Sequence, residues 1–185
     1  MYLLPGVIGF LFFILFDFNK IYWKNRILNL FFILGSLLLI FSTVYCIAKS
    51  DFSVLVSNFD NWKLLCSICL LLAGFGLIYA LFFALPFEST YVQSDDLPLV
   101  NKGLYGLCRH PGFWMFVLFY GFLALLFSNI QLFYCFLVYN TCNFLYIVLQ
   151  DVYIFPRYIR GYLEYKKAVP FILPTLDSIR NAFSK

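Results

Sequence analysis

Charged residues are scarce in this chain of 185 residues: Asp, Glu, Lys and Arg make up 12% of it, and histidine occurs once. An ordinary soluble domain has about a quarter of its residues charged, so the composition excludes that class. With 63% hydrophobic residues and a mean hydropathy of +0.88, the chain is typical of an integral membrane protein. At roughly 20 residues a span, its length allows about five transmembrane helices.

Other features are also missing. No basic residues precede the first apolar run, which argues against a secretory signal peptide and for a first membrane helix. The six cysteines give no metal-ligand pattern, because the C-x-x-C of Cys66 and Cys69 lies in an apolar run without a second ligand pair. We expect no metal site and no disulfide. Since no repeat or low-complexity linker divides the chain, residues 1–185 are predicted to form a single domain.

The apolar runs predict an all-α polytopic membrane protein. Only Ser128, Asn129 and Ile130 join the last two spans, so these spans should form an antiparallel C-terminal helical hairpin. The tail that follows, from Gln150, is amphipathic and basic at first. The expected spans are about Tyr2–Phe16, Ile27–Ala48, Leu64–Phe87, Phe113–Phe127 and Gln131–Leu149.

Basic residues fall mainly on one side of this five-span arrangement. The other side holds only Lys49 and Lys63. By the positive-inside rule the richer side is cytosolic, so the N-terminus is expected outside, and the tail and the loop before the fourth span in the cytosol. The residues on the cytosolic side are Lys20, Lys24, Arg26, Lys102, Arg109, Arg157, Arg160, Lys166, Lys167, Arg180 and Lys185.

The loop before the fourth span carries the densest polar cluster, with Arg109 and His110 directly before Pro111. Proline is favoured at the first position of a helix, so Arg109 and His110 should lie at a helix N-terminus. Free N–H groups there favour an anionic or acceptor group. In an alternative role, Arg109 only grips a lipid phosphate and His110 only caps the helix.

Asp151, at the end of the fifth span, forms the second cluster. The tight hairpin should place Asp151 beside His110 at the same membrane depth. The carboxylate, the imidazole and the guanidinium of Arg109 could bind a ligand together. Equally, Asp151 could form a purely structural salt bridge to Arg109.

Three further expectations are not catalytic. Asp17 should pair with Lys20, three residues on. Lys166 and Lys167 should contact anionic lipid headgroups. Cys108, although next to Arg109, is expected to be a packing residue.

Together these segments resemble the isoprenylcysteine carboxyl methyltransferase family and its bacterial and archaeal relatives. The matching residues are L-V-N-K-G-L-Y at 99–105, R-H-P-G-F at 109–113 and Y-L-E-Y-K-K-A-V-P at 162–170. The resemblance covers roughly residues 95–174, the expected cofactor-binding part of the domain. The first three spans match only in being hydrophobic.

The resemblance implies an enzyme that binds S-adenosylmethionine at the cytosolic ends of the last two helices. It would methylate a lipophilic acceptor that approaches from the bilayer, and its partners would be membrane lipids and no nucleic acid. The implied catalytic residues are Arg109, His110 and Asp151. The implied cofactor-binding residues are Leu97, Pro98, Leu99, Val100, Gly103, Tyr105, His110, Pro111, Gly112, Phe113, Gln150 and Asp151.

Two positions depart from the family pattern. Gln150-Asp151 stands where the family usually has a pair of Glu, and Tyr146 or Ile147 stands where relatives that methylate a prenylcysteine carboxylate have an Arg. The acceptor therefore stays open between a carboxylate, an amine and a thiol. Two other functions remain as alternatives: an NADPH-dependent reductase of the sterol-reductase type, whose relatives share an Arg-His beside an aromatic hairpin, and a non-catalytic membrane relative.

Overall fold

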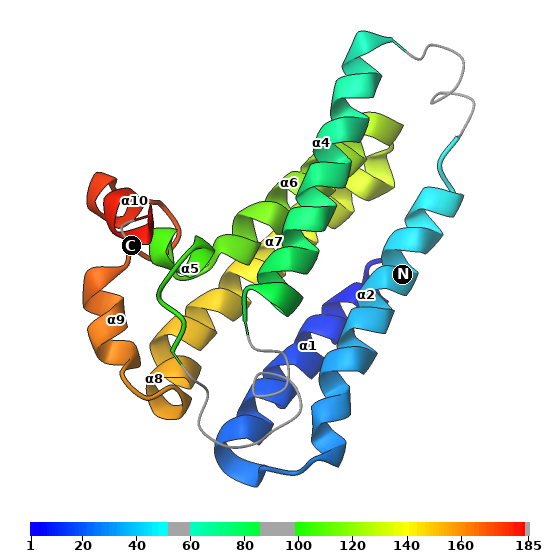
Figure 1. Cartoon of the computed structure of the whole chain (residues 1–185). Coiled ribbons are helices and arrows are strands. Elements are labelled where there is room, and N and C mark those ends of the chain that lie inside the picture. Colours follow the sequence, from blue (N-terminus) through cyan, green and yellow to red (C-terminus); the bar gives the residue numbers. More distant parts are fainter. Residues whose placement is uncertain (52–59, 86–98, 184–185) are drawn as a thin grey trace.

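The computed structural model describes residues 1–51, 60–85 and 99–183, and all regular elements in these ranges are helices (Figure 1). The N-terminal part consists of α1 (Leu4–Phe18), α2 (Leu30–Ala48) and α4 (Asn61–Ile78). The C-terminal part consists of α5 (Leu104–Leu107), α6 (Pro111–Phe127), α7 (Ile130–Leu149), α8 (Phe155–Tyr158), α9 (Tyr162–Ala168) and α10 (Leu176–Phe183). A 3₁₀ turn, η2 (Ile27–Asn29), leads into α2, and π-helical turns η1 (Asn19–Trp23), η3 (Tyr79–Phe83) and η5 (Gln150–Ile154) extend α1, α4 and α7.

Four helical stretches are long and apolar enough to cross a membrane: Leu4–Trp23, Ile27–Ala48, Asn61–Phe83 and Ile130–Tyr158. The all-α polytopic membrane fold is therefore confirmed. Helix α6 has 17 residues, or about 25 Å at 1.5 Å per residue, against a hydrocarbon core of about 30 Å. A fifth span at α6 stays a prediction.

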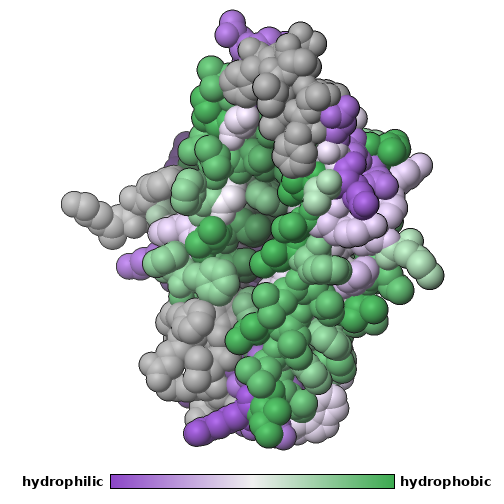
Figure 2. Space-filling view, turned by 90° about the vertical axis from the view of Figure 1, so that its right-hand side faces the viewer, coloured by the Kyte–Doolittle hydropathy of each residue, from purple (hydrophilic) through white to green (hydrophobic). Residues whose placement is uncertain are grey.

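Apolar side chains cover the outside of these helices, as expected for contact with lipid. Phe41 on α2 and Phe75 on α4 are 62% and 68% exposed. The face drawn in Figure 2, on the α2 side of the molecule, is mostly hydrophobic, with hydrophilic residues mainly toward its edges.

The structure moves several of the expected span boundaries. The first span runs from Leu4 to Trp23 rather than from Tyr2 to Phe16, because η1 continues α1. The third span begins at Asn61 rather than Leu64, because the Asp60 side chain accepts a hydrogen bond from the backbone N–H of Lys63 at 2.9 Å and caps the helix. The expected end of that span, Phe87, lies outside the described residues. The fifth span does not end at Leu149, since η5 and α8 continue it to Tyr158.

Helices α6 and α7 form the antiparallel hairpin that the short connection predicts (Figure 1). Ser128 ends α6 in the left-handed conformation, with φ of 47°. The Asn129 side chain then accepts hydrogen bonds from the backbone N–H groups of Gln131 and Leu132, at 2.7 and 3.3 Å, and caps α7. The hairpin places the start of α6 and the end of α7 at one end of the molecule, which we call the hairpin base.

A mixed aromatic and hydroxyl core joins the two halves. Phe10 of α1 packs against Phe116 of α6, with ring centroids 6.1 Å apart. Thr43 of α2 hydrogen-bonds the hydroxyl of Tyr120 on α6 at 2.7 Å. Hydrogen bonds of this kind supply direction that apolar packing lacks in lipid, so they fix how α2 sits against the hairpin.

Candidate functional site

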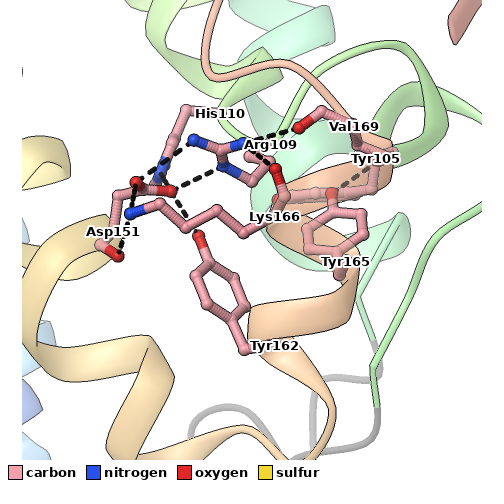
Figure 3. A network of polar contacts seen from close by, with 8 residues as sticks. All are labelled: Tyr105, Arg109, His110, Asp151, Tyr162, Tyr165, Lys166 and Val169. Carbon is pink, nitrogen blue, oxygen red and sulfur yellow. Dashed lines mark hydrogen bonds and ion pairs between the residues drawn. The ribbon is translucent and has the colours of Figure 1, made fainter.

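Arg109 and Asp151 form a buried ion pair at the hairpin base (Figure 3). Arg109 lies just before α6, and Asp151 lies in η5, directly after α7. Arg109 Nε and Nη2 donate to the two carboxylate oxygens of Asp151 at 2.6 and 3.2 Å. The two residues are only 8% and 4% exposed. The fold thus brings together the residues that the sequence expects to be neighbours.

Two side chains of α9 complete the surroundings of Asp151 (Figure 3). The Tyr162 hydroxyl donates to Asp151 Oδ1 at 2.7 Å. Lys166 Nζ lies 2.6 Å from Asp151 Oδ2 and donates to the backbone carbonyl of Asp151 at 3.1 Å. Asp151 therefore accepts from Arg109, Tyr162 and Lys166, and we call these four residues the base cluster.

This arrangement gives the two neighbouring lysines of α9 different environments. Lys166, expected to contact lipid headgroups, is instead part of the base cluster. Lys167 pairs with Glu164 at 3.1 Å, and both of those side chains are about three-quarters exposed. Lys167 is thus the more exposed of the two cations, because its side chain is 74% exposed and that of Lys166 is 34% exposed.

Arg109 also fixes the last turn of α9 and the chain that follows it. Its Nη1 donates to the carbonyls of Lys166 and Val169, at 3.0 and 2.5 Å. Its backbone N–H points at the carbonyls of Pro170 and Phe171, at 2.9 and 3.1 Å. Residues 169–172, which we call the strap, are therefore held across the start of α6.

His110 lies in the same place but is bonded differently. It is 7% exposed, stacks on Phe155 at 5.9 Å and meets Phe171 edge-on at 5.2 Å. Its Nε2 is 3.7 Å from Asp151 Oδ1, beyond hydrogen-bond distance, and has no hydrogen-bond partner among the described residues. Burial lowers the pKa of His110 despite the nearby Asp151 carboxylate, so the ring is neutral near pH 7 and presents one nitrogen as an acceptor.

Buried tyrosines surround this site as neutral donors. Burial raises the pKa of Tyr105, Tyr162 and Tyr165. The hydroxyl of Tyr105 donates to the carbonyl of Ala80, in the π-helical turn η3, at 3.0 Å. The hydroxyl of Tyr165 donates to the carbonyl of Tyr105 at 2.5 Å. Tyr105, an expected cofactor residue, thus links the loop to η3 and α9.

The other expected cofactor residues lie in the loop before α6 and in the first turn of α6. Gly103 has φ of 60°, a conformation that favours glycine and lets the chain turn into α5. Leu99 packs against the apolar cluster of Ile159, Tyr162, Tyr165 and Val169. Val100 precedes this turn, and Pro111, Gly112 and Phe113 form the first turn of α6. Leu97 and Pro98 lie outside the described residues.

Gln150 makes its contact away from the base cluster. Its Nε2 donates to Asp17 Oδ2 on α1 at 2.9 Å. The local pairing expected for Asp17 is only part of its surroundings, since Asp17 attracts Lys20 electrostatically and also bonds a helix distant in sequence. The contact of Gln150 with Asp17 joins the π-helical turn that carries Asp151 to the N-terminal helices.

Sequence reasoning named the segment that contains Tyr162 and Lys166 but not their part in the cluster. The Y-x-x-Y-K pattern puts Tyr162 and Lys166 four residues apart, on one face of a short helix. That periodicity was the available signal. Phe155 and Phe171, which enclose His110, carry no comparable signal because each is one of many aromatic residues in the chain.

Two hollows lie elsewhere on the described surface. One, of about 430 Å³, is lined by residues 156–164. The other, of about 600 Å³, is lined by Leu15, Tyr22, Trp23, Asn25, Leu28 and Phe31. The lining of neither includes His110 or Asp151, although the first contains Tyr162. Among the described residues, no three His, Cys, Asp or Glu side chains gather where they could hold a metal ion.

The charges at the hairpin base do not cancel. Arg109 and Lys166 face the single carboxylate of Asp151, so the base cluster is net positive and would attract an anionic group. Beside it, His110 offers a buried nitrogen that has no hydrogen-bond partner within the described ranges. Comparisons with models of protein families, with curated proteins and with solved structures find no match to this chain.

Proposed function

We propose that this chain is an integral membrane methyltransferase that binds S-adenosylmethionine beside His110 and methylates a lipophilic acceptor. The proposal rests on the L-V-x-x-G-x-Y-x-x-x-R-H-P and Y-x-x-Y-x-x-x-V-P patterns of the sequence, which resemble the isoprenylcysteine carboxyl methyltransferase family. The two patterns are in direct contact through Arg109 and Val169. The observation that carries most weight is the buried His110 Nε2 without a hydrogen-bond partner among the described residues.

The residues at the hairpin base fit the chemistry of this cofactor. A buried polar nitrogen without a partner is unfavourable unless a ligand or water satisfies it, and a neutral imidazole can accept a hydrogen bond from an amine or a hydroxyl. The net positive charge of Arg109, Lys166 and Asp151 suits a carboxylate group. Lys166 can reach a ligand, because its side chain is 34% exposed. When bound, S-adenosylmethionine would supply an electrophilic methyl group on a sulfonium.

The geometry separates the roles of the three expected catalytic residues. Four of the five N–H groups of Arg109 side chain already point at Asp151, Lys166 and Val169. Both carboxylate oxygens of Asp151 are occupied as well. In our proposal Arg109 and Asp151 are positioning residues, and His110 is the residue that contacts the ligand.

The remaining expected residues would enclose the cofactor from the loop side. Leu99, Val100, Gly103 and Tyr105 lead up to α6, and Pro111, Gly112 and Phe113 begin it. Gln150 would act indirectly, since its side chain bonds Asp17.

The site would face the cytosol, where the count of basic residues puts it by the positive-inside rule. The cofactor is water-soluble and the acceptor is apolar, so only the membrane surface gives both of them access. Methyl transfer is an in-line displacement, and alignment of the reactants with exclusion of water can supply much of its rate. The stacked rings of His110 and Phe155 would help to exclude water.

One observation favours a non-catalytic membrane protein as the second candidate. Asp151 is 4% exposed and its oxygens are bonded to three side chains of this chain. The role of such a cluster could be purely structural: it would hold α9 and the strap against the α6–α7 hairpin. In that case no donor molecule would bind.

Calorimetric titration of the purified protein in detergent with S-adenosylmethionine and with NADPH separates these functions. We expect binding of S-adenosylmethionine and none of NADPH. Because His110 is the proposed contact, His110→Ala should weaken this binding at least about tenfold, or about 1.4 kcal/mol. Failure of the wild-type protein to bind S-adenosylmethionine would overturn the proposal, and binding of NADPH would favour a reductase.

The two lysines of α9 provide a matched pair of variants for the same titration. Lys166→Ala removes a cation from the base cluster, whereas Lys167→Ala removes an exposed cation one residue away. We expect weaker cofactor binding in the first variant and unchanged binding in the second. The acceptor is then identified by incubation with donor radiolabelled on the methyl group and a membrane lipid extract, followed by analysis of the labelled species.

A further inference from the structure

Helix α10 has one side fixed to the protein. Ser178 is 2% exposed, and its hydroxyl donates to the carbonyl of Leu107 on α5 at 2.8 Å. Gly106 of α5 meets Ala182 so closely that an added Cβ would lie 3.1 Å from the Ala182 Cβ. Thr175 and Ser178 cap the start of the helix reciprocally, at 2.9 and 3.2 Å. The orientation of α10 about its own axis is therefore set.

A second side of α10 is apolar and exposed. Leu176 is 75% exposed and Ile179 is 41% exposed. Leu173, just before the helix, is 65% exposed. Leu176 and Ile179 are three residues apart and share a side, as do the exposed charged residues Asp177 and Arg180. The helix thus has a packed side, an apolar side and a charged side.

The strap fixes the depth at which α10 begins. The indole N–H of Trp114, in the first turn of α6, donates to the carbonyl of Ile172 at 2.6 Å. The backbone N–H of His110 points at the carbonyl of Phe171 at 3.3 Å. The strap therefore lies beside the first turn of α6, and α10 begins shortly after the strap. Tryptophan is enriched at this boundary between lipid and water.

We propose that α10 lies on the surface of the membrane, with Leu173, Leu176 and Ile179 among the lipids. A lipid surface is the occupant that the structure favours, because the stripe starts at the level where α6 begins its apolar run. The adjacent Arg180 can reach headgroup phosphates, and an amphipathic helix with an apolar stripe beside a charged side suits an interfacial position. This inference is independent of methyl transfer.

Helix α10, as a membrane anchor, would affect the position of Arg109 and His110 through the strap. The strap holds the backbone of Arg109 and His110, and α10 follows it directly. A helix seated in the interface would keep these carbonyls in place over the start of α6. Detachment of α10 would leave the strap bound only by its own hydrogen bonds.

Photo-crosslinking in vesicles tests the contact with lipid. The purified full chain carries benzoylphenylalanine at position 176 or at position 177, in vesicles of phosphatidylcholine and phosphatidylglycerol. Leu176 and Asp177 are adjacent and both exposed, so the pair differs mainly in the side of the helix. We expect at least about fivefold more lipid adduct from position 176 than from position 177. Equal labelling at both positions, or adducts between two copies of the chain, would overturn the inference.

Hydrogen exchange gives a second measurement that needs no photoreactive group. Leu176→Ser with Ile179→Ser should raise amide exchange in residues 170–183 about fivefold or more in vesicles, since the apolar stripe is lost. The matched control, Asp177→Ser with Arg180→Ser, should change exchange there less than twofold. Unchanged exchange in the first variant would count against the anchor, whatever the outcome of the cofactor titration.

Discussion

Two regions of the molecule are stabilised by different interactions. One is the contact between α1 and α2, and the other is the hairpin base, at the start of α6 and the end of α7. Between α1 and α2 the contact depends on shape: a Cβ added to Gly9 would lie 2.6 Å from the backbone oxygen of Gly35, and the rings of Phe12 and Phe31 stack at 5.2 Å. At the hairpin base the contact depends on charge, with the Asp151 carboxylate between Arg109 and Lys166.

The difference matters because lipid is as apolar as the helices it surrounds. Two apolar helices gain little from leaving lipid for each other unless their surfaces fit closely or carry polar bonds. When one side chain changes in a closely packed helix contact, only part of the stability is lost. When one side chain of a buried ion cluster is removed, the loss in the free energy of unfolding is much larger, because the remaining charge is left buried without its counter-charge.

The largest effect should therefore come from Arg109. Arg109→Met leaves Asp151 with one cation and removes the hydrogen bonds to the carbonyls of Lys166 in α9 and Val169 in the strap. We expect a loss of about 3 to 5 kcal/mol in the free energy of unfolding, measured by chemical or thermal unfolding in detergent. The control is Arg157→Met, whose guanidinium stacks on the Tyr153 ring at 3.7 Å and should cost at most about 1 kcal/mol. Equal losses in the two variants would show that the base cluster stabilises the fold no more than an exposed cation does.

Gly9→Ala tests the other side of the comparison. Its Cβ would collide with the backbone of Gly35, so α1 and α2 must move apart, at a cost of about 1 to 3 kcal/mol. At Gly74 an added Cβ would lie at an ordinary 3.6 Å from the Phe119 ring. Gly74→Ala should accordingly be neutral or stabilising by up to about 1 kcal/mol. If both variants unfold at the same temperature, close helix contact is not what holds the N-terminal hairpin.

The same contrast explains how far the sequence could predict this molecule. Apolar runs and a three-residue connection are local signals, and they were sufficient for the helices and for the meeting of Arg109 with Asp151. Lys166 and Tyr162 belong to the C-terminal tail, which packs against the hairpin base. The spacing of residues within the tail does not predict which part of the protein the tail contacts. A local rule therefore assigned Lys166 to lipid headgroups.

Asp17 shows the same limit in the N-terminal half. The i, i+3 rule predicted Lys20, which does attract Asp17 electrostatically. It did not predict Gln150, on a different helix, which donates to Asp17 at 2.9 Å. Contacts between helices depend on how the helices are rotated and paired. In a chain whose helices are apolar on nearly every side, the hydrophobic pattern does not define that rotation.

The pH dependence of stability that comes from His110 should be a smaller effect than the two substitutions above, because a single side chain titrates and no contact is removed. Burial lowers the pKa of His110 in the folded protein, whereas unfolded histidine keeps a pKa of about 6.5. The unfolded state thus binds more protons as the pH falls below about 6.5, and stability falls with it. Between about pH 7.5 and 5.5 the melting temperature should drop further in the wild type than in His110→Gln. Parallel curves for the two proteins would contradict a buried neutral imidazole.

The smallest effect should come from the hydroxyl pair in the core. Thr43 donates to the carbonyl of Leu39 at 2.8 Å, so in its contact with Tyr120 at 2.7 Å it is the acceptor. A double-mutant cycle of Thr43→Val and Tyr120→Phe should give a coupling of about 0.6 kcal/mol, and at most about 1.7 kcal/mol. Unfolding free energies of the four proteins in one detergent measure it. A coupling as large as the loss in Arg109→Met would mean that neutral hydrogen bonds hold the bundle as strongly as the ions hold its base, and the contrast between the two regions would disappear.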